Sequence, residues 1–148
     1  MSSISTVAKR KILLQKLLIS IKKHESEVIE ALYKDFKKPA FEAVITETSY
    51  VISDLKNTIS NINRWSRPKR VWPSIINFPS SDFIYSEPYG RVLIISPWNY
   101  PFQLAMCPLI AAIAAGNTVV LKPSELTFNT SQIITKIVEE VFDVKEAV

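Results

Sequence analysis

The sequence predicts an α/β protein in which N-terminal helices are followed by the first β-α-β-α units of a doubly wound parallel sheet. Two observations predict this class. Apolar residues recur at helical spacing between residues 5 and 62, whereas residues 91–142 alternate short β-branched runs with helical patterns. A third observation concerns the size of the sheet. Residues 91–142 contain only two parallel strands, whereas doubly wound sheets normally have more strands and are covered on both faces. We therefore expect an incomplete sheet.

Three amphipathic helices are expected first. One occupies about residues 5–22, a second ends at Pro39, and a third, longer pattern stops near Trp65, where an Arg-Pro pair breaks it. Residues 67–82 contain three prolines and are expected to run over a surface as a connecting segment. The apolar positions of the three helical patterns are Leu14, Leu17, Leu18, Ile21, Val28, Ile29, Leu32, Tyr33, Phe36, Val44, Thr48, Val51, Leu55, Thr58 and Ile62.

The elements of the sheet follow. Arg91–Ser96 is short, apolar and rich in β-branched residues, which predicts a strand buried on both faces. A helix at about 102–115 is apolar almost all round, and Gly116 is expected to cap its C-terminus. A second buried strand at Thr118–Leu121 and an amphipathic helix from about Asn129 to Phe142 complete the pattern.

Composition excludes several classes of site. The chain has 148 residues, 47% hydrophobic and 22% charged, which suits one globular domain. Two glycines are too few for any phosphate loop built on a glycine cluster. A single cysteine, Cys107, excludes a disulfide framework and a cysteine-based metal cage, and we predict no metal site. His24 is expected on an exposed face without a partner that would make it a base.

The net charge of +4 is unevenly distributed, because 14 of the 18 Lys and Arg residues lie within residues 1–70. Since these lysines alternate with apolar residues, a solvated helix face is the favoured explanation, and no nucleic acid is expected as a partner. A basic module that binds nucleic acid or a membrane surface through residues 9–23 and 64–70 is the alternative. Prolines and a glycine divide the uncharged stretch from Val92 to Leu121, so we predict no membrane segment. The N-terminal apolar run after residues 9–11 is interrupted by Gln15, Lys16, Lys22 and Lys23, so it does not form the apolar core of a signal peptide. Together with the unpaired cysteine, this favours a cytoplasmic location.

Ligands of a doubly wound sheet bind beyond the carboxyl ends of its strands. Here those ends are the loops at residues 96–101 and 122–125, whose sequences are SPWNYP and KPSE. Both loops place polar groups where a nucleotide would lie, and neither uses glycine. The residues alone leave two interpretations open: the loops bind a cofactor, or their prolines merely stiffen the connections to the helices.

Two longer segments resemble known signatures. Residues 87–101, EPYGRVLIISPWNYP, resemble the segment that opens the cofactor domain of aldehyde dehydrogenases, and residues 115–125, AGNTVVLKPSE, continue that pattern in order and spacing. Residues 32–39 with Glu42 also fit the early helices of this family. The SPWNYP variant resembles the class 3 or fatty-aldehyde branch. The resemblance covers nearly the whole chain and implies an incomplete Rossmann-like NAD-binding domain of the aldehyde dehydrogenase type.

The resemblance implies an NAD(P)-dependent oxidation of an aldehyde to a carboxylic acid, through a cysteine thiohemiacetal and a thioester. It assigns Asn99 to stabilisation of the developing oxyanion and Tyr100 to the substrate pocket. The implied cofactor contacts are Ser96, Pro97 and Trp98 near the nicotinamide, and Lys122 and Glu125 at the adenosine ribose. A carboxylate at the ribose favours NAD, and NADP stays open as a second cofactor.

The nucleophilic cysteine, the general-base glutamate and a glycine-rich nicotinamide turn of this family belong to later motifs, which the 148 residues do not contain. Cys107 is not a substitute, because a thiol within an apolar helix has a raised pKa and is inert. We therefore expect residues 1–148 alone to be inactive.

The resemblance also implies a domain assignment. Residues 1–148 would be the N-terminal part of the NAD(P)-binding domain, without the catalytic domain. Its expected parts are a helical region at 1–66, a connecting segment at 67–82, strands at 83–96, and the helix-strand-helix continuation at 97–148. An alternative class is a truncated pseudoenzyme or interaction module that pairs with a full-length relative through the strands at 83–96. A homodimer is equally open.

Overall fold

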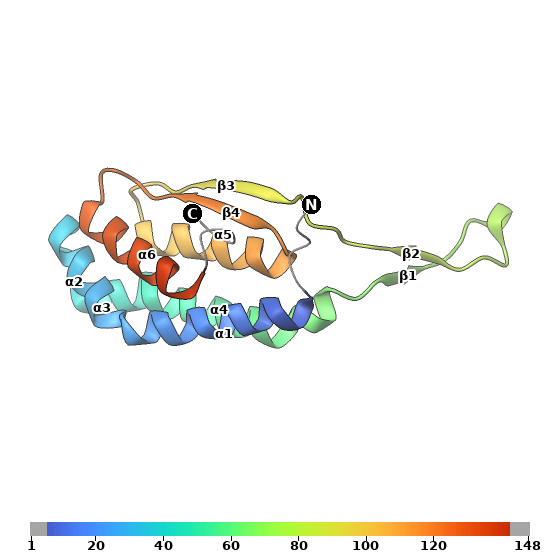
Figure 1. Cartoon of the computed structure of the whole chain (residues 1–148), viewed down its shortest axis with the longest axis horizontal. Helices are drawn as coiled ribbons and strands as arrows, with labels where there is room; N and C mark the ends of the chain where they lie inside the picture. The colour runs from blue at the N-terminus through green and yellow to red at the C-terminus, as the bar shows by residue number, and fades with distance from the viewer. Residues whose placement is uncertain (1–5, 143–148) are drawn as a thin grey trace.

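The computed structural model describes residues 6–142 and shows a layer of helices beneath a two-stranded parallel sheet, with a thin arm extending from one end (Figure 1). The predicted α/β class is confirmed. In chain order the elements are α1 (Val7–Lys23), α2 (Glu25–Phe36), α3 (Ala40–Ala43), the π-helical turn η1 (Val44–Thr48), α4 (Ser49–Trp65), β1 (Lys69–Val71), the 3-10 turn η2 (Ile75–Asn77), β2 (Asp82–Ile84), β3 (Arg91–Ile95), α5 (Pro101–Ala115), β4 (Thr118–Lys122) and α6 (Phe128–Val141).

The N-terminal helices match the apolar patterns, with one interruption. Helix α1 begins after Thr6, and the expected start at residue 5 lies outside the described residues. The third pattern ends at Trp65 as predicted, but it is divided into α3, η1 and α4 rather than forming one helix. Turn η1 buries the neighbouring side chains of Glu47 and Thr48, and such π-helical turns are frequent at functional sites.

Helix α5 is apolar all round because it is the central helix, in contact with α1, α4, α6 and both strands of the parallel sheet. Phe102, Met106 and Ile110 are fully buried, and burial of each such side chain stabilises the fold by about 1.5–3 kcal/mol. Gly116 caps α5 in the left-handed conformation with φ +93°, as predicted. No helix within residues 6–142 combines the length and the apolar character that crossing a membrane requires.

Strands β3 and β4 pair in parallel, from Arg91 opposite Thr118 to Ile95 opposite Lys122. Helix α5 lies against one face of this pair. The opposite face carries Leu93 and Ile95, which are 62% and 66% exposed. The prediction of a strand buried on both faces is therefore wrong for the described residues, because no further layer covers the second face there.

The arm consists of the antiparallel pair β1–β2 and its connection (Figure 1). No strand was predicted between residues 67 and 82, but the structure places β1 there, with Lys69 opposite Ile84. This strand has three residues, two of them basic, which is too short for an alternating pattern to be visible. Trp72 lies beyond it and is 96% exposed.

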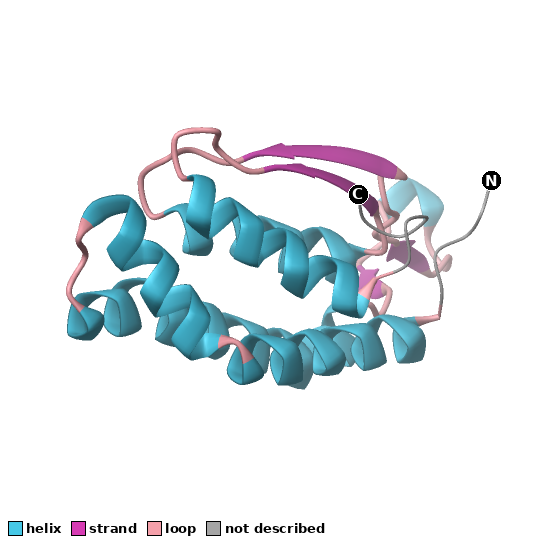
Figure 2. Cartoon of the chain, turned by 60° about the vertical axis from the view of Figure 1, so that its left-hand side comes forward, coloured by secondary structure: helices cyan, strands magenta, loops and turns pink. Residues whose placement is uncertain are grey.

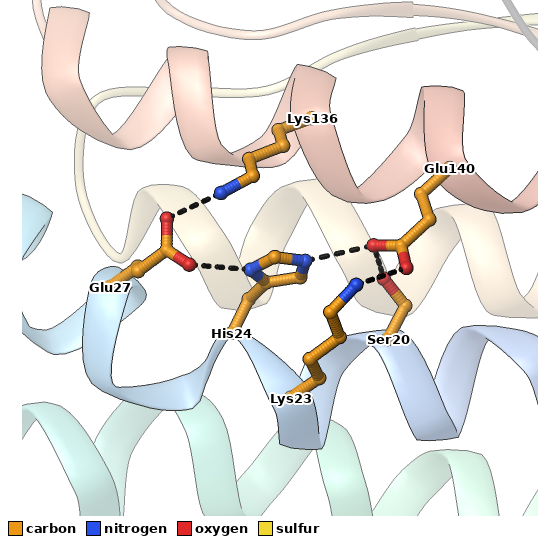
Figure 3. Close-up of polar contacts among 6 residues, drawn as sticks. All are labelled: Ser20, Lys23, His24, Glu27, Lys136 and Glu140. Atoms are coloured by element: carbon orange, nitrogen blue, oxygen red, sulfur yellow. Dashed lines mark hydrogen bonds and ion pairs between the residues drawn. The ribbon is translucent and has the colours of Figure 1, made fainter.

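His24 joins the α1–α2 corner to α6 (Figure 3). The predicted exposed histidine without a partner is wrong, because His24 is only 4% exposed. Its Nδ1 lies 2.6 Å from Oε1 of Glu27, and its Nε2 lies 2.8 Å from Oε2 of Glu140. The ammonium groups of Lys136 and Lys23 pair with the same two carboxylates at 2.7 and 2.6 Å. The helical layer is thereby bound to the last turns of α6.

Candidate functional site

The loops that follow β3 and β4 lie side by side at one edge of the sheet (Figure 2). Parallel pairing in register makes this necessary, because Ile95 and Lys122 are opposite each other at the ends of their strands. The backbone N–H of Ser96 donates to the carbonyl oxygen of Lys122 at 3.1 Å. The two polar segments singled out from the sequence, 96–101 and 122–125, therefore meet at the edge where this fold class binds ligands.

The first loop presents several side chains to solvent. Pro97, Trp98 and Asn99 are exposed, whereas Ser96 is buried at the strand end. The Ser96 hydroxyl oxygen is buried without a hydrogen-bond partner among the described residues. Since buried hydroxyl groups normally have a partner, this atom fits a site that a polar ligand completes. Tyr100 ends the loop in the left-handed conformation, with φ +46°.

A buried carboxylate that the sequence analysis missed holds the start of α5. Glu47 is fully buried, and its Oε2 accepts from the backbone N–H groups of Phe102 and Gln103 at 2.9 and 3.2 Å. Its Oε1 receives the ammonium group of Lys38 at 2.6 Å. The same ammonium lies 4.5 Å from the ring centroid of Tyr100. A signal existed in the sequence, because Glu47 lies three residues after Val44 and four before Val51, on the apolar face of the third helical pattern.

The second loop carries an ion pair. The ammonium of Lys122 lies 2.7 Å from Oε2 of Glu125, and this hydrogen bond holds the pKa of Glu125 below its usual value. Both side chains are exposed, so their attraction adds little to stability and leaves them free to rearrange around a ligand. Ser124 fixes the loop behind them, because its carbonyl oxygen accepts from the hydroxyl of Ser131 at 2.8 Å.

A second carboxylate holds the start of α6. Oδ2 of Asp35 accepts from the backbone N–H and the hydroxyl of Thr130 at 2.8 and 2.7 Å, and Oδ1 accepts from the backbone and side chain of Asn129. Burial raises the pKa of Asp35, but these hydrogen bonds outweigh it and keep the pKa below its usual value. Helices α5 and α6 thus both begin on carboxylates from the N-terminal helices. Their first-turn N–H groups bind Glu47 and Asp35 rather than being open to an anion.

Residues 3–148 match the sequence model of the aldehyde dehydrogenase family along nearly the whole chain. The chain belongs to the aldehyde dehydrogenase family. It is 46% identical over 134 residues to 4,4'-diaponeurosporen-aldehyde dehydrogenase of Staphylococcus aureus, covering 90% of this chain and 29% of that protein. It is 44% identical over 130 residues to aldehyde dehydrogenase family 3 member H1 of Arabidopsis thaliana, covering 88% of this chain and 27% of that protein.

A solved aldehyde dehydrogenase structure has the same arrangement of elements. The substrate-bound state of Staphylococcus aureus AldH superposes with a TM-score of 0.94 at 43% identity. The match covers 97% of this chain and 31% of that one. The chain therefore spans less than a third of the length of these aldehyde dehydrogenases, and its described fold is a partial Rossmann-like NAD-binding domain.

Within this aldehyde dehydrogenase chain, Cys107 lies midway along α5, half-buried and close to Asp54 of α4. Burial raises the pKa of its thiol from 9.0 to about 12, and the Asp54 carboxylate adds to the increase. The expectation of a raised thiol pKa is confirmed, and this side chain is poorly suited to nucleophilic attack.

Proposed function

We propose that residues 1–148 form the N-terminal part of the NAD(P)-binding domain of an enzyme that oxidises an aldehyde to a carboxylic acid. The observation that carries the proposal is that the loop containing Asn99 and the loop containing Lys122 and Glu125 follow paired parallel strands at the same sheet edge, in a chain of the aldehyde dehydrogenase family. The named relative of family 3 supports assignment to the class 3 or fatty-aldehyde branch. A cytoplasmic location, the inactivity of residues 1–148 alone and the domain division at residues 66, 82 and 96 belong to the same proposal.

Asn99 is proposed to act on the substrate. Its side-chain amide, on an exposed part of the loop, donates a hydrogen bond to the aldehyde oxygen as negative charge develops there. Such a donor is worth about 2.7–4 kcal/mol in the transition state, because it is fixed before the charge appears. Tyr100 borders the substrate pocket and limits how the aldehyde lies against Asn99.

The remaining site residues are proposed to hold the cofactor, which supplies a hydride acceptor when bound. Ser96, Pro97 and Trp98 line its nicotinamide end, and the unpartnered hydroxyl of Ser96 supports a polar contact there. Glu125 accepts from the ribose hydroxyl groups, with Lys122 beside it. Since the exposed Glu125 carboxylate is ionised at neutral pH, the site favours NAD and repels a 2′-phosphate, while the adjacent Lys122 still permits NADP.

The test is steady-state kinetics of the protein produced from its own gene, with hexanal and NAD as the probe substrates. Asn99→Ala is expected to lower kcat by about 100- to 1,000-fold with little change in the KM for NAD. Glu125→Gln is expected to raise the KM for NAD and to reduce discrimination against NADP. A wild-type protein without aldehyde-dependent NAD(P)H formation overturns the proposed activity. An Asn99→Ala enzyme with wild-type kcat overturns the oxyanion role alone.

A second candidate function is an interaction module that pairs with a full-length relative, or with a second copy in a homodimer. The observation that favours it is the uncovered sheet face at Leu93 and Ile95. The native product captured with an antibody to residues 1–148 distinguishes the candidates. An intact mass several times 16.8 kDa supports the enzyme. A mass of 16.8 kDa together with a co-purified longer homologue supports the interaction module.

A further inference from the structure

We propose that Glu47 and Lys38 are positioning residues for Asn99, acting through the start of α5 and the ring of Tyr100. The inference rests on the proposed function of Asn99. Neither side chain reaches the reacting atoms in this proposal. Their role is to hold the five-residue loop at 96–100 in one conformation, so that the Asn99 amide is in place before the aldehyde arrives.

The loop at 96–100 is anchored at both of its ends. At its start, the Ser96 N–H donates to the carbonyl oxygen of Lys122. At its end, the N–H groups of Phe102 and Gln103 donate to Oε2 of Glu47. The residue at the N-cap position, Tyr100, makes no side-chain cap hydrogen bond. Glu47 therefore supplies, from 55 positions earlier in the chain, the acceptor that a local cap would normally provide.

Tyr100 directly follows Asn99 in the loop. Its φ of +46° is a strained conformation for a residue with a side chain, and such residues persist only where their surroundings fix them. The ammonium of Lys38 lies over the Tyr100 ring, 4.5 Å from its centroid, while it binds Oε1 of Glu47 at 2.6 Å. One cation thus connects the helix cap to the strained residue beside Asn99.

Burial of the Glu47 carboxylate has an energetic cost. A fully buried charge is unfavourable unless it is paired and hydrogen-bonded, and both oxygens of Glu47 are used in that way. The π-helical turn η1 brings Glu47 inward next to buried Thr48, whose hydroxyl donates to Glu25. Glu47 thus holds the start of α5 directly and, through Lys38, is connected to the Tyr100 ring.

The experiment compares Glu47→Gln with Asp35→Asn in the protein produced from its own gene. Asp35 is the matched control, because it caps α6 as Glu47 caps α5, and its hydrogen bonds within the described residues go to Asn129 and Thr130. Hydrogen exchange is followed in peptides covering residues 96–106 and 125–133. Glu47→Gln is expected to speed exchange about tenfold or more in the first peptide only, and Asp35→Asn in the second only.

Kinetics supply the second readout. Glu47→Gln is expected to lower kcat about 100-fold, as a small misplacement of a reacting group does, and to raise the KM for NAD far less, because Glu47 holds the end of the loop beside Asn99 while the cofactor contacts begin at Ser96, which Lys122 holds. Unchanged exchange at 96–106 overturns the proposal, and so does a loosened loop that keeps wild-type kcat. If the wild-type protein turns over no aldehyde, the proposed function fails, and the exchange result decides by itself whether Glu47 holds the loop.

Lys38 provides a second variant in case Glu47→Gln does not fold. Lys38→Met removes the cation from both the Tyr100 ring and the buried Glu47 carboxylate, so kcat is expected to fall and exchange to rise across residues 102–106. Lys38→Arg keeps a cation over the ring and is expected to restore wild-type kcat and exchange. Equal behaviour of the Met and Arg variants would overturn the role assigned to this cation.

Discussion

Nε2 of His24 lies 2.8 Å from Oε2 of Glu140, although 116 positions separate the two residues in the chain. The other ring nitrogen lies 2.6 Å from Glu27. A neutral imidazole has one N–H, so both contacts are hydrogen bonds only when the ring is protonated. His24 therefore links the helical layer to the C-terminal end of α6, which is the end away from the loop at 122–125.

Replacement of His24 is the most direct test of this link. His24→Ala is expected to lower the free energy of unfolding by about 1–3 kcal/mol, because two carboxylates lose a buried donor. Urea denaturation of residues 1–148 measures the change. The control is Lys34→Ala, which breaks the exposed Lys34–Glu30 pair and is expected to change stability by about 0.5 kcal/mol or less. Similar losses for both variants would contradict the buried role of His24.

The same network makes stability depend on pH. Hydrogen bonds from Lys23, His24 and Ser20 lower the pKa of Glu140 from 4.5 to about 2. A carboxyl group whose pKa is lower in the folded state stabilises the fold above its unfolded-state pKa, and this contribution is lost as the pH falls toward the folded-state value. The urea midpoint is therefore expected to fall between about pH 5 and pH 2. Glu140→Gln is expected to flatten this dependence, whereas the exposed neighbour variant Glu139→Gln is not.

Features that depend on neighbouring residues could be predicted from the sequence, whereas contacts between residues far apart in the chain could not. Strands β3 and β4, the loops after them and the cap at Gly116 could be predicted, because each depends on neighbouring residues. The partner of His24 and the contact between Glu47 and α5 could not, because they join segments 116 and 55 positions apart. The only local sign of the second contact was a carboxylate within an apolar stripe. The paired strand β1 was missed because three residues cannot show a period.

Gly116 provides a test of the local prediction. The backbone φ of Gly116 is +93°, and a Cβ added at this position would lie 3.3 Å from Nη1 of Arg10. The Arg10 guanidinium cannot move away freely, because it donates to the carbonyl oxygen of Ala114 at 2.6 Å. Gly116→Ala is expected to lower the free energy of unfolding by about 1–2 kcal/mol. Gly90→Ala is the matched control, because Gly90 has a φ of +101° but open space around a Cβ. A larger loss for Gly90→Ala would show that crowding by Arg10 is unimportant.

The Cys107 thiol is expected to be unreactive in the folded chain. With its pKa raised to about 12 by burial and by Asp54, its thiolate fraction near pH 8 is about a thousandfold below that of a thiol with the ordinary value of 9.0. Alkylation by iodoacetamide should accordingly be slow in the folded chain and should accelerate about a thousandfold in urea. Rapid labelling of the folded chain would show that the side chain is more exposed than the structure indicates.

The unreactive Cys107 thiol also determines how residues 1–148 behave in an enzyme assay. An aldehyde dehydrogenase of this mechanism needs a thiolate, and the single cysteine of these residues is held as a thiol away from the loop at 96–100. No aldehyde-dependent NADH formation above the blank is therefore expected from residues 1–148 alone. The control is the Cys107→Ser variant. Turnover that persists in this variant would mean that the reaction proceeds without a cysteine, and the proposed chemistry would then have to be replaced. Turnover lost on Cys107→Ser would instead contradict the inert role of Cys107.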